Sequence, residues 1–115
     1  MIQRTFFMLL KATPLWRALD ADEQRAVFDD ALMTVFNGYP DLRMSRFNAS
    51  AFHGCCSHVI VWELHAHAEV CQYTEAVEAL HARPFFAAPL FEILDVISGV
   101  EDEVDTLLPI QAFAA

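Results

Sequence analysis

Residues 42–66, LRMSRFNASAFHGCCSHVIVWELHA, decide the fold that we predict for this chain. Both halves of the stretch are rich in strand-forming residues, and Gly54 between them marks a turn, so the pattern predicts strands over 42–53 and 56–66. If Gly54-Cys55 is a two-residue hairpin turn, the numbers of opposed residues sum to 109. This turn therefore fixes a register in which Arg46 lies opposite Glu63.

Alternation of side chains along the two strands then divides the hairpin into two faces. One face is apolar and carries Phe47, Ala49, Ala51, Ile60, Trp62 and Leu64. The other face is mixed and carries Arg46, Asn48, Ser50, Val59, Val61 and Glu63, with His65 beyond. We expect the apolar face to meet the helices and the mixed face to point away from them.

The flanking sequence predicts one strand and one helix on each side of this hairpin. An apolar run over 4–12 ends at Thr13-Pro14, which predicts a buried strand followed by a short helical turn. Asp20 and Glu23 resemble a capping box, and the helix after them is apolar at Phe28, Ala31, Leu32, Val35 and Phe36. A second helix is predicted over about 68–82 and a last strand over 90–98.

The resulting order, βαββαβ, is that of a ferredoxin-like α+β fold, in which both helices cover one face of an antiparallel sheet. We expect a single domain over 1–115, with a C-terminal extension from about residue 104. Because 56% of the residues are hydrophobic, a chain this small needs a partner surface, and we expect a homodimer formed through the open face of the sheet.

The net charge disfavours some classes of partner. Seven basic and sixteen acidic residues give a net charge of −9, which disfavours nucleic acids and anionic membrane surfaces. No apolar run approaches the roughly 20 residues that a membrane-spanning helix needs.

Three cysteines, two of them adjacent, make a poor disulfide framework, so we expect a cytoplasmic protein.

The sequence resembles the darcynin family and, more broadly, the dimeric α+β barrel superfamily. The resemblance extends to about Glu103 and is carried by residues 7–16, 20–36, 46–52, 62–63, 83–91 and 97–102. It implies a ferredoxin-like dimer. The superfamily includes cofactor-free monooxygenases, haem-degrading enzymes, lactone isomerases and binding proteins, so the resemblance implies no single activity.

Arg46 and Glu63 are the first candidates for a site, because the assumed register puts them side by side. Arg46 would anchor a carboxylate or enolate, and Glu63 would orient it or move protons. The alternative is a structural ion pair. Asp95 is a lone carboxylate in an apolar strand, which suits a general base if it is buried and is unremarkable if it faces solvent.

Aromatic residues supply the candidate substrate contacts. Trp16 lies between a strand end and a helix start, where a cleft can open, and Tyr73 and His65 are further candidates, although such residues more often belong to the core. The cluster His53-Gly-Cys-Cys-Ser-His58 is spaced badly for zinc, so we predict no metal site. We find no phosphate loop and no nucleophile motif, and we expect no organic cofactor.

Two hypotheses remain open. The first is a small-molecule-binding protein, or a small cofactor-free enzyme, that acts on an apolar or aromatic metabolite. The second is a structural or interaction homodimer without chemistry. A pre-formed apolar pocket with convergent polar groups favours the first hypothesis, and a filled core favours the second.

Overall fold

A computed structural model of the chain describes residues 2–49, 56–87 and 89–100. The elements in chain order are β1 (Ile2–Ala12), α1 (Pro14–Arg17), α2 (Ala21–Gly38), β2 (Leu42–Asn48), β3 (His58–His65), α3 (Val70–His81), α4 (Pro84–Ala87) and β4 (Phe91–Gly99). The strands form one antiparallel sheet in the order β2-β3-β1-β4. This arrangement confirms the predicted ferredoxin-like order, to which α1 and α4 add short turns. The C-terminal extension and the turn at Gly54-Cys55 lie outside the described residues.

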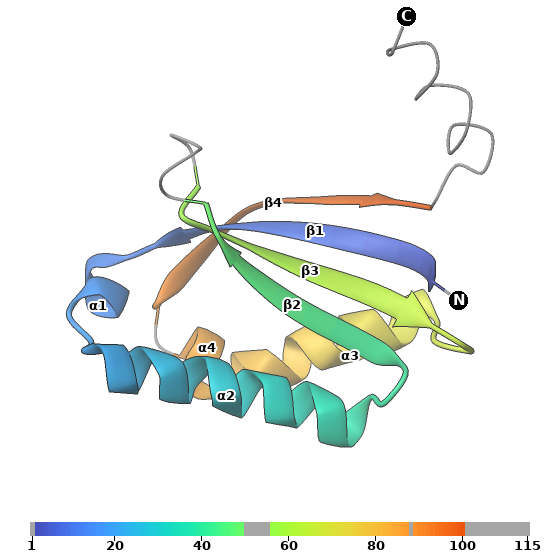
Figure 1. Cartoon of the computed structure of the whole chain (residues 1–115), viewed down its shortest axis with the longest axis horizontal. Helices are drawn as coiled ribbons and strands as arrows, with labels where there is room; N and C mark the ends of the chain where they lie inside the picture. Colours follow the sequence, from blue (N-terminus) through green and yellow to red (C-terminus); the bar gives the residue numbers. More distant parts are fainter. Residues whose placement is uncertain (1, 50–55, 88, 101–115) are drawn as a thin grey trace, which may run out of the picture.

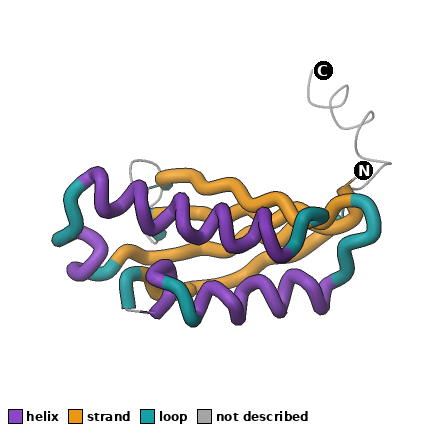
Figure 2. The backbone as a smooth tube through the Cα atoms, turned by 90° about the horizontal axis from the view of Figure 1, so that it is seen from below, coloured by secondary structure: helices purple, strands orange, loops and turns teal. Residues whose placement is uncertain are grey.

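Both long helices, α2 and α3, lie on the same side of the sheet (Figure 1). Seen from the helix side in Figure 2, they lie in front of the strands as one layer and run roughly along them. The core lies between the layers and contains Ile60, Trp62 and Leu64, which are at most 1% exposed, as their alternation predicts. Phe28, Ala31 and Val35 of α2 pack against it, whereas Phe36 is 62% exposed, so its predicted place on the buried side of α2 is wrong.

The start of α2 is fixed by the predicted capping box. The Asp20 carboxylate accepts the backbone N–H of Glu23 at 2.8 Å, and the Glu23 carboxylate accepts the backbone N–H of Asp20 at 3.0 Å. These bonds satisfy two donors that a helix start leaves without intrahelical partners. The cap therefore sets where α2 begins above the sheet.

The register between β2 and β3 differs from the predicted one. Arg46 pairs with Ile60, Phe47 with Val59, and Arg43 with Glu63. Opposed residue numbers thus sum to 106 rather than 109, and this shift by three residues turns every side chain of β2 to the other face. The prediction that Arg46 lies opposite Glu63 is wrong, because the two strands are joined by a longer connection than a two-residue turn.

The open face of the sheet is largely apolar. Phe7, Phe47 and Ile97 are exposed there, and Leu9, Val59 and Val61 are partly buried between them. No described helix covers this face (Figure 1). An apolar surface of this kind is typical of an interface.

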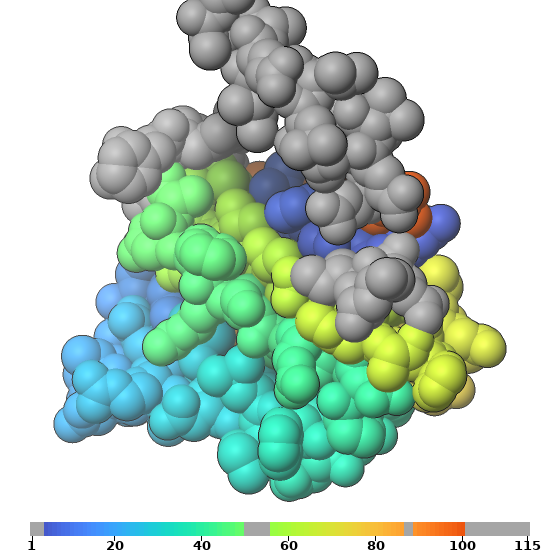
Figure 3. Space-filling model, turned by 45° about the vertical axis from the view of Figure 1, so that its right-hand side comes forward, coloured from blue at the N-terminus to red at the C-terminus, as the bar shows by residue number. Residues whose placement is uncertain are grey.

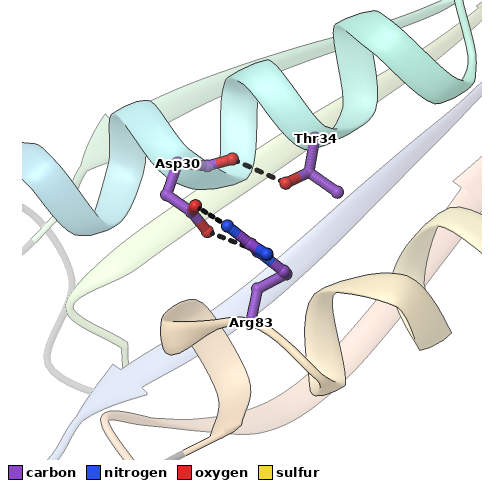
Figure 4. A network of polar contacts seen from close by, with 3 residues as sticks. All are labelled: Asp30, Thr34 and Arg83. Carbon is purple, nitrogen blue, oxygen red and sulfur yellow. Dashed lines mark hydrogen bonds and ion pairs between the residues drawn. The ribbon is translucent and has the colours of Figure 1, made fainter.

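An ion pair ties α2 to the segment between α3 and α4. Arg83 donates to both carboxylate oxygens of Asp30, with Nε 3.1 Å from Oδ2 (Figure 4). The backbone carbonyl of Asp30 also accepts the Thr34 hydroxyl at 2.8 Å. The pair bridges two elements that are far apart in sequence.

Replacing Arg83 by glutamine is expected to lower the melting temperature at neutral pH, with a difference from the parent that shrinks in acid. The hydrogen bonds and charge of Arg83 hold the pKa of Asp30 below its ordinary value of 3.8. A carboxyl with a lowered folded-state pKa contributes stability that is complete above the unfolded pKa and is lost as pH falls through the folded pKa. Thermal melts from about pH 7 to about pH 2 test this dependence.

Arg25→Gln is the control, because its 3.7 Å pair with Asp22 joins two exposed side chains and should contribute little at any pH. A difference between the parent and Arg83→Gln that stays constant down to the lowest pH would contradict the electrostatic explanation. It would assign the effect to packing of the arginine stem instead.

Candidate functional site

A cleft of about 300 Å³ lies on the helix side of the sheet. It is bounded by the start of α2, the C-terminal end of β2 and the N-terminal end of β3. The helical wall is formed by Trp16, Ala21, Gln24, Arg25 and Phe28. The strand wall is formed by Arg46, Phe47, Asn48 and His58. Figure 3 looks onto the side of the molecule where β2, in green, borders α2, in blue to turquoise.

Arg46 reaches this cleft because the observed register turns it toward the helices. Its guanidinium carbon lies 4.1 Å from the centre of the Phe28 ring, which is cation–π distance. Stacking on an aromatic face leaves the edge of a guanidinium, which carries its N–H donors, able to bind an anion. Among the described residues, no carboxylate forms an ion pair with Arg46.

His58 is the residue of this cleft that the sequence reasoning missed. It is the first residue of β3, and its ring packs against Trp16, Phe28 and Phe91 at centroid distances of 5.9, 6.0 and 5.3 Å. Its Nδ1 lies 2.9 Å from the Ser57 hydroxyl. Burial, together with the positive charge of Arg46, lowers the pKa of His58 below 6.5, so the imidazole is neutral at pH 7.

Trp16 forms the apolar end of the cleft. It is 5% exposed and contacts Phe28 and Phe91, with ring centres 5.2 and 4.6 Å away. The side-chain amide of Gln24 donates to the Trp16 carbonyl at 3.1 Å and thereby joins α2 to α1. The wall is thus built of aromatic rings that fix one another.

The other candidate residues lie elsewhere. Glu63 and His65 are on the open face, with Glu63 Oε1 3.3 Å from His65 Nε2. Tyr73 is in the core, where its ring stacks on Phe6 at 3.9 Å and makes an edge-to-face contact with Trp62 at 5.4 Å between ring centres. Asp95 is exposed on β4. The structure therefore brings together Arg46 and Trp16, but not the remaining four candidates.

A second, more open depression of about 570 Å³ lies on the open face. It is lined by Thr5, Phe7, Ser45, Phe47, Val59, Val61 and Glu63. Phe47 therefore borders both hollows. Few polar groups converge here, so the depression resembles an interface more than a ligand site.

The cleft is positively charged in an acidic protein. Arg46 and Arg25 are two of only seven basic residues in the chain, and no acidic residue is among the described residues that line the cleft. This combination favours small anions with an aromatic body. The described part of the chain contains no group of three or more His, Cys, Asp or Glu residues that could hold a metal ion. Part of the predicted His53–His58 cluster lies outside the described residues.

None of the described helices is both long enough and apolar enough to cross a membrane.

Solved structures similar to this chain are chlorite dismutases. A variant of the enzyme from Candidatus Nitrospira defluvii matches 100% of this chain and 46% of its own, with a TM-score of 0.72 and 14% identity. A dimeric chlorite dismutase from Nitrobacter winogradskyi matches 87% of this chain and 58% of its own, with a TM-score of 0.67 and 16% identity. The chain thus spans about half the length of these structures. At such identities the likeness confirms the α+β fold alone.

Similarity in sequence identifies the family. The family model described as "Darcynin, domain of unknown function" matches residues 2–113, beyond the end at Glu103 that the resemblance predicts. Darcynin from Chromobacterium violaceum is 35% identical over 68 residues, covering 59% of this chain and 82% of the relative. A darcynin homologue from Streptomyces avermitilis is 31% identical over 99 residues, covering 85% and 78%. This chain therefore belongs to the darcynin family.

Proposed function

We propose that this protein binds a small aromatic metabolite that carries a negative charge, in the cleft between α2 and the sheet. The observation that carries the proposal is the position of Arg46, a cation stacked on an aromatic ring at the wall of a pre-formed cleft. Rings bury the body of such a ligand, and the guanidinium fixes its anionic group through charge-assisted hydrogen bonds.

We also propose that the protein works as a homodimer formed through the open face. The exposed Phe7, Phe47 and Ile97 support this assembly, since apolar side chains gathered on one sheet face gain free energy when a second copy covers them. A fold neighbour is dimeric as well.

Cys56 and Cys71 are free thiols, which supports a reducing compartment such as the cytoplasm.

Aromatic acids are expected to raise the melting temperature of the parent, and Arg46→Met is expected to weaken their binding roughly 10- to 100-fold. A hydrogen bond to a charged group contributes about 1.5–3 kcal/mol, which corresponds to this change in affinity. The measurement is a thermal-shift titration with benzoate, 4-hydroxybenzoate and 2-naphthoate. Neutral benzamide is the reference compound.

Arg43→Met is the matched control, because Arg43 lies on the same strand but pairs with Glu63, on the open face. This variant should lose the same formal charge and keep the ligand response. Equal weakening in both variants would show that net charge, rather than the cleft, governs binding. If none of the acids stabilised the parent, the second hypothesis, a homodimer without a ligand, would take the place of this proposal.

A further inference from the structure

We propose that His58 takes the proton of a weakly acidic aromatic hydroxyl compound, a phenol or enol, bound in the cleft, so that the ligand is held as its anion beside Arg46. This inference rests on the proposed function and names its ligand class. Because a carboxylic acid is already ionised at neutral pH, it would use Arg46 alone. An aromatic hydroxyl must lose a proton first, and His58 lies where an acceptor is needed.

The charged surroundings of His58 favour an anion. Arg46 faces it from β2 and Arg25 faces the same cleft from α2, while α1 and β4 present the uncharged rings of Trp16 and Phe91. The described lining residues include no carboxylate, and the carboxylate that pairs with Arg25, that of Asp22 at 3.7 Å, is exposed to solvent. An anion formed from the ligand would therefore lie beside Arg46 and near Arg25, in a cleft whose helical wall includes the rings of Trp16 and Phe28.

Hydrogen bonds orient the His58 ring. The Ser57 hydroxyl accepts the backbone N–H of Ala12 at 2.7 Å and donates to the Leu10 carbonyl at 3.4 Å. We assign the imidazole proton to Nδ1, which then donates to Ser57 Oγ at 2.9 Å. Nε2 keeps its lone pair and is the proton acceptor. Ser57 is 7% exposed, so this support lies in the protein interior.

The transfer needs no further reactant. The ligand O–H bond breaks, an N–H bond forms at Nε2, and the oxygen keeps the electron pair as an aryloxide or enolate beside the guanidinium. No electrons leave the ligand, and the protons balance within the complex. His58 is neutral before binding, so its lone pair is available, but burial and the charge of Arg46, which lower its pKa, also disfavour the imidazolium. The transfer therefore depends on the aryloxide forming between the imidazolium and Arg46, where its negative charge offsets both cations.

The test uses 4-nitrophenol, whose anion absorbs visible light, with 4-nitroanisole as a matched compound that has no acidic hydrogen. One pH unit below the pKa of the free phenol, only about one tenth of it is ionised. We expect more than half of the 4-nitrophenol bound to the parent to show the absorbance of the anion. Calorimetry in two buffers of different ionisation enthalpy should show no net proton release, because the proton stays on the protein.

His58→Gln, compared at ligand saturation so that weaker affinity does not imitate the effect, should lose most of the anion absorbance. His65→Gln, on the same strand but the open face, should behave as the parent, and circular dichroism checks that both variants fold. Release of about one proton to buffer per bound anion would overturn the role of His58. So would anion formation in His58→Gln equal to that of the parent.

Different outcomes would contradict the proposed function and the proton transfer to His58. If neither 4-nitrophenol nor 4-nitroanisole bound while benzoate still did, this inference would be wrong and the proposed function would stand; if the aromatic acids failed as well, both would be wrong. If both compounds bound and 4-nitrophenol stayed neutral, only the proton transfer would be wrong.

Discussion

A lysine in place of Val61 is expected to leave the protein as a monomer of 13.0 kDa, whereas the parent is expected to be a dimer at micromolar concentration. Val61 lies in the middle of the open face, paired with Phe7 on β1 and Ser45 on β2. An ammonium group buried there without a partner would cost several kcal/mol, which is enough to dissociate most dimers of this size. Light scattering coupled to size-exclusion chromatography measures the mass of the parent and of the Val61→Lys variant.

Met33→Lys is the control for this prediction. Met33 is 55% exposed on α2, on the helix side of the molecule, so the added charge stays in water and the dimer should persist. A parent that was monomeric at tens of micromolar, or a Val61→Lys variant that remained dimeric, would show that the open face is not the interface.

Trp62→Ala is expected to lower the free energy of unfolding by about 3–5 kcal/mol. Trp62 is fully buried in the centre of β3 and meets Tyr73 of α3 edge to face. Since a small domain has a total stability of about 5–15 kcal/mol, the loss is a large part of the whole. Urea unfolding at a fixed protein concentration measures it, because the stability of a dimer depends on concentration.

Trp62→Phe separates the contribution of the apolar volume of Trp62 from that of its indole N–H. The indole N–H of Trp62 is buried, and no described group accepts a hydrogen bond from it. Phenylalanine keeps much of the apolar volume and removes this unsatisfied donor, so we expect less than half of the alanine effect. Equal losses for the two variants would show that the indole N–H, or the larger ring that carries it, contributes to stability.

Much of the fold follows from one-sided patterns in the sequence. Ile60, Trp62 and Leu64 alternate with less apolar neighbours, which leaves one reasonable choice for the buried face of β3. The pairing of Asp20 with Glu23 marks the start of α2 through local chemistry alone. Both features depend on residues that are close in sequence, so they can be predicted without a structure.

The register of β2 was not predictable in this way. Its apolar residues fall on both faces, with Leu42 and Met44 on one and Phe47 on the other, so alternation does not choose between them. The choice depends on the length of the connection to β3, and a glycine between two strands does not fix that length. The error moved Arg46 from the cleft to the open face, and with it the predicted site.

His58 shows the opposite case, in which a usable signal was passed over. Its number has the same parity as Ile60, Trp62 and Leu64, so alternation alone places it on the helix side of β3. Grouping it with the adjacent cysteines as a candidate metal cluster hid this relationship. In this chain the polar residue in phase with the buried face of β3 is the one that lines the cleft.

β4 is an edge strand of the sheet, and its structure limits how the protein can aggregate. Its pairing with β1 shifts between Ile93 and Asp95, which is a bulge, and Asp95 Oδ1 accepts the backbone N–H of Val96 at 2.8 Å. One donor of the edge is therefore already occupied, and a negative charge stands beside it. Bulges and charges at such edges prevent indefinite strand-by-strand growth into fibrils, so Asp95 protects the solubility of a chain with apolar residues along β4.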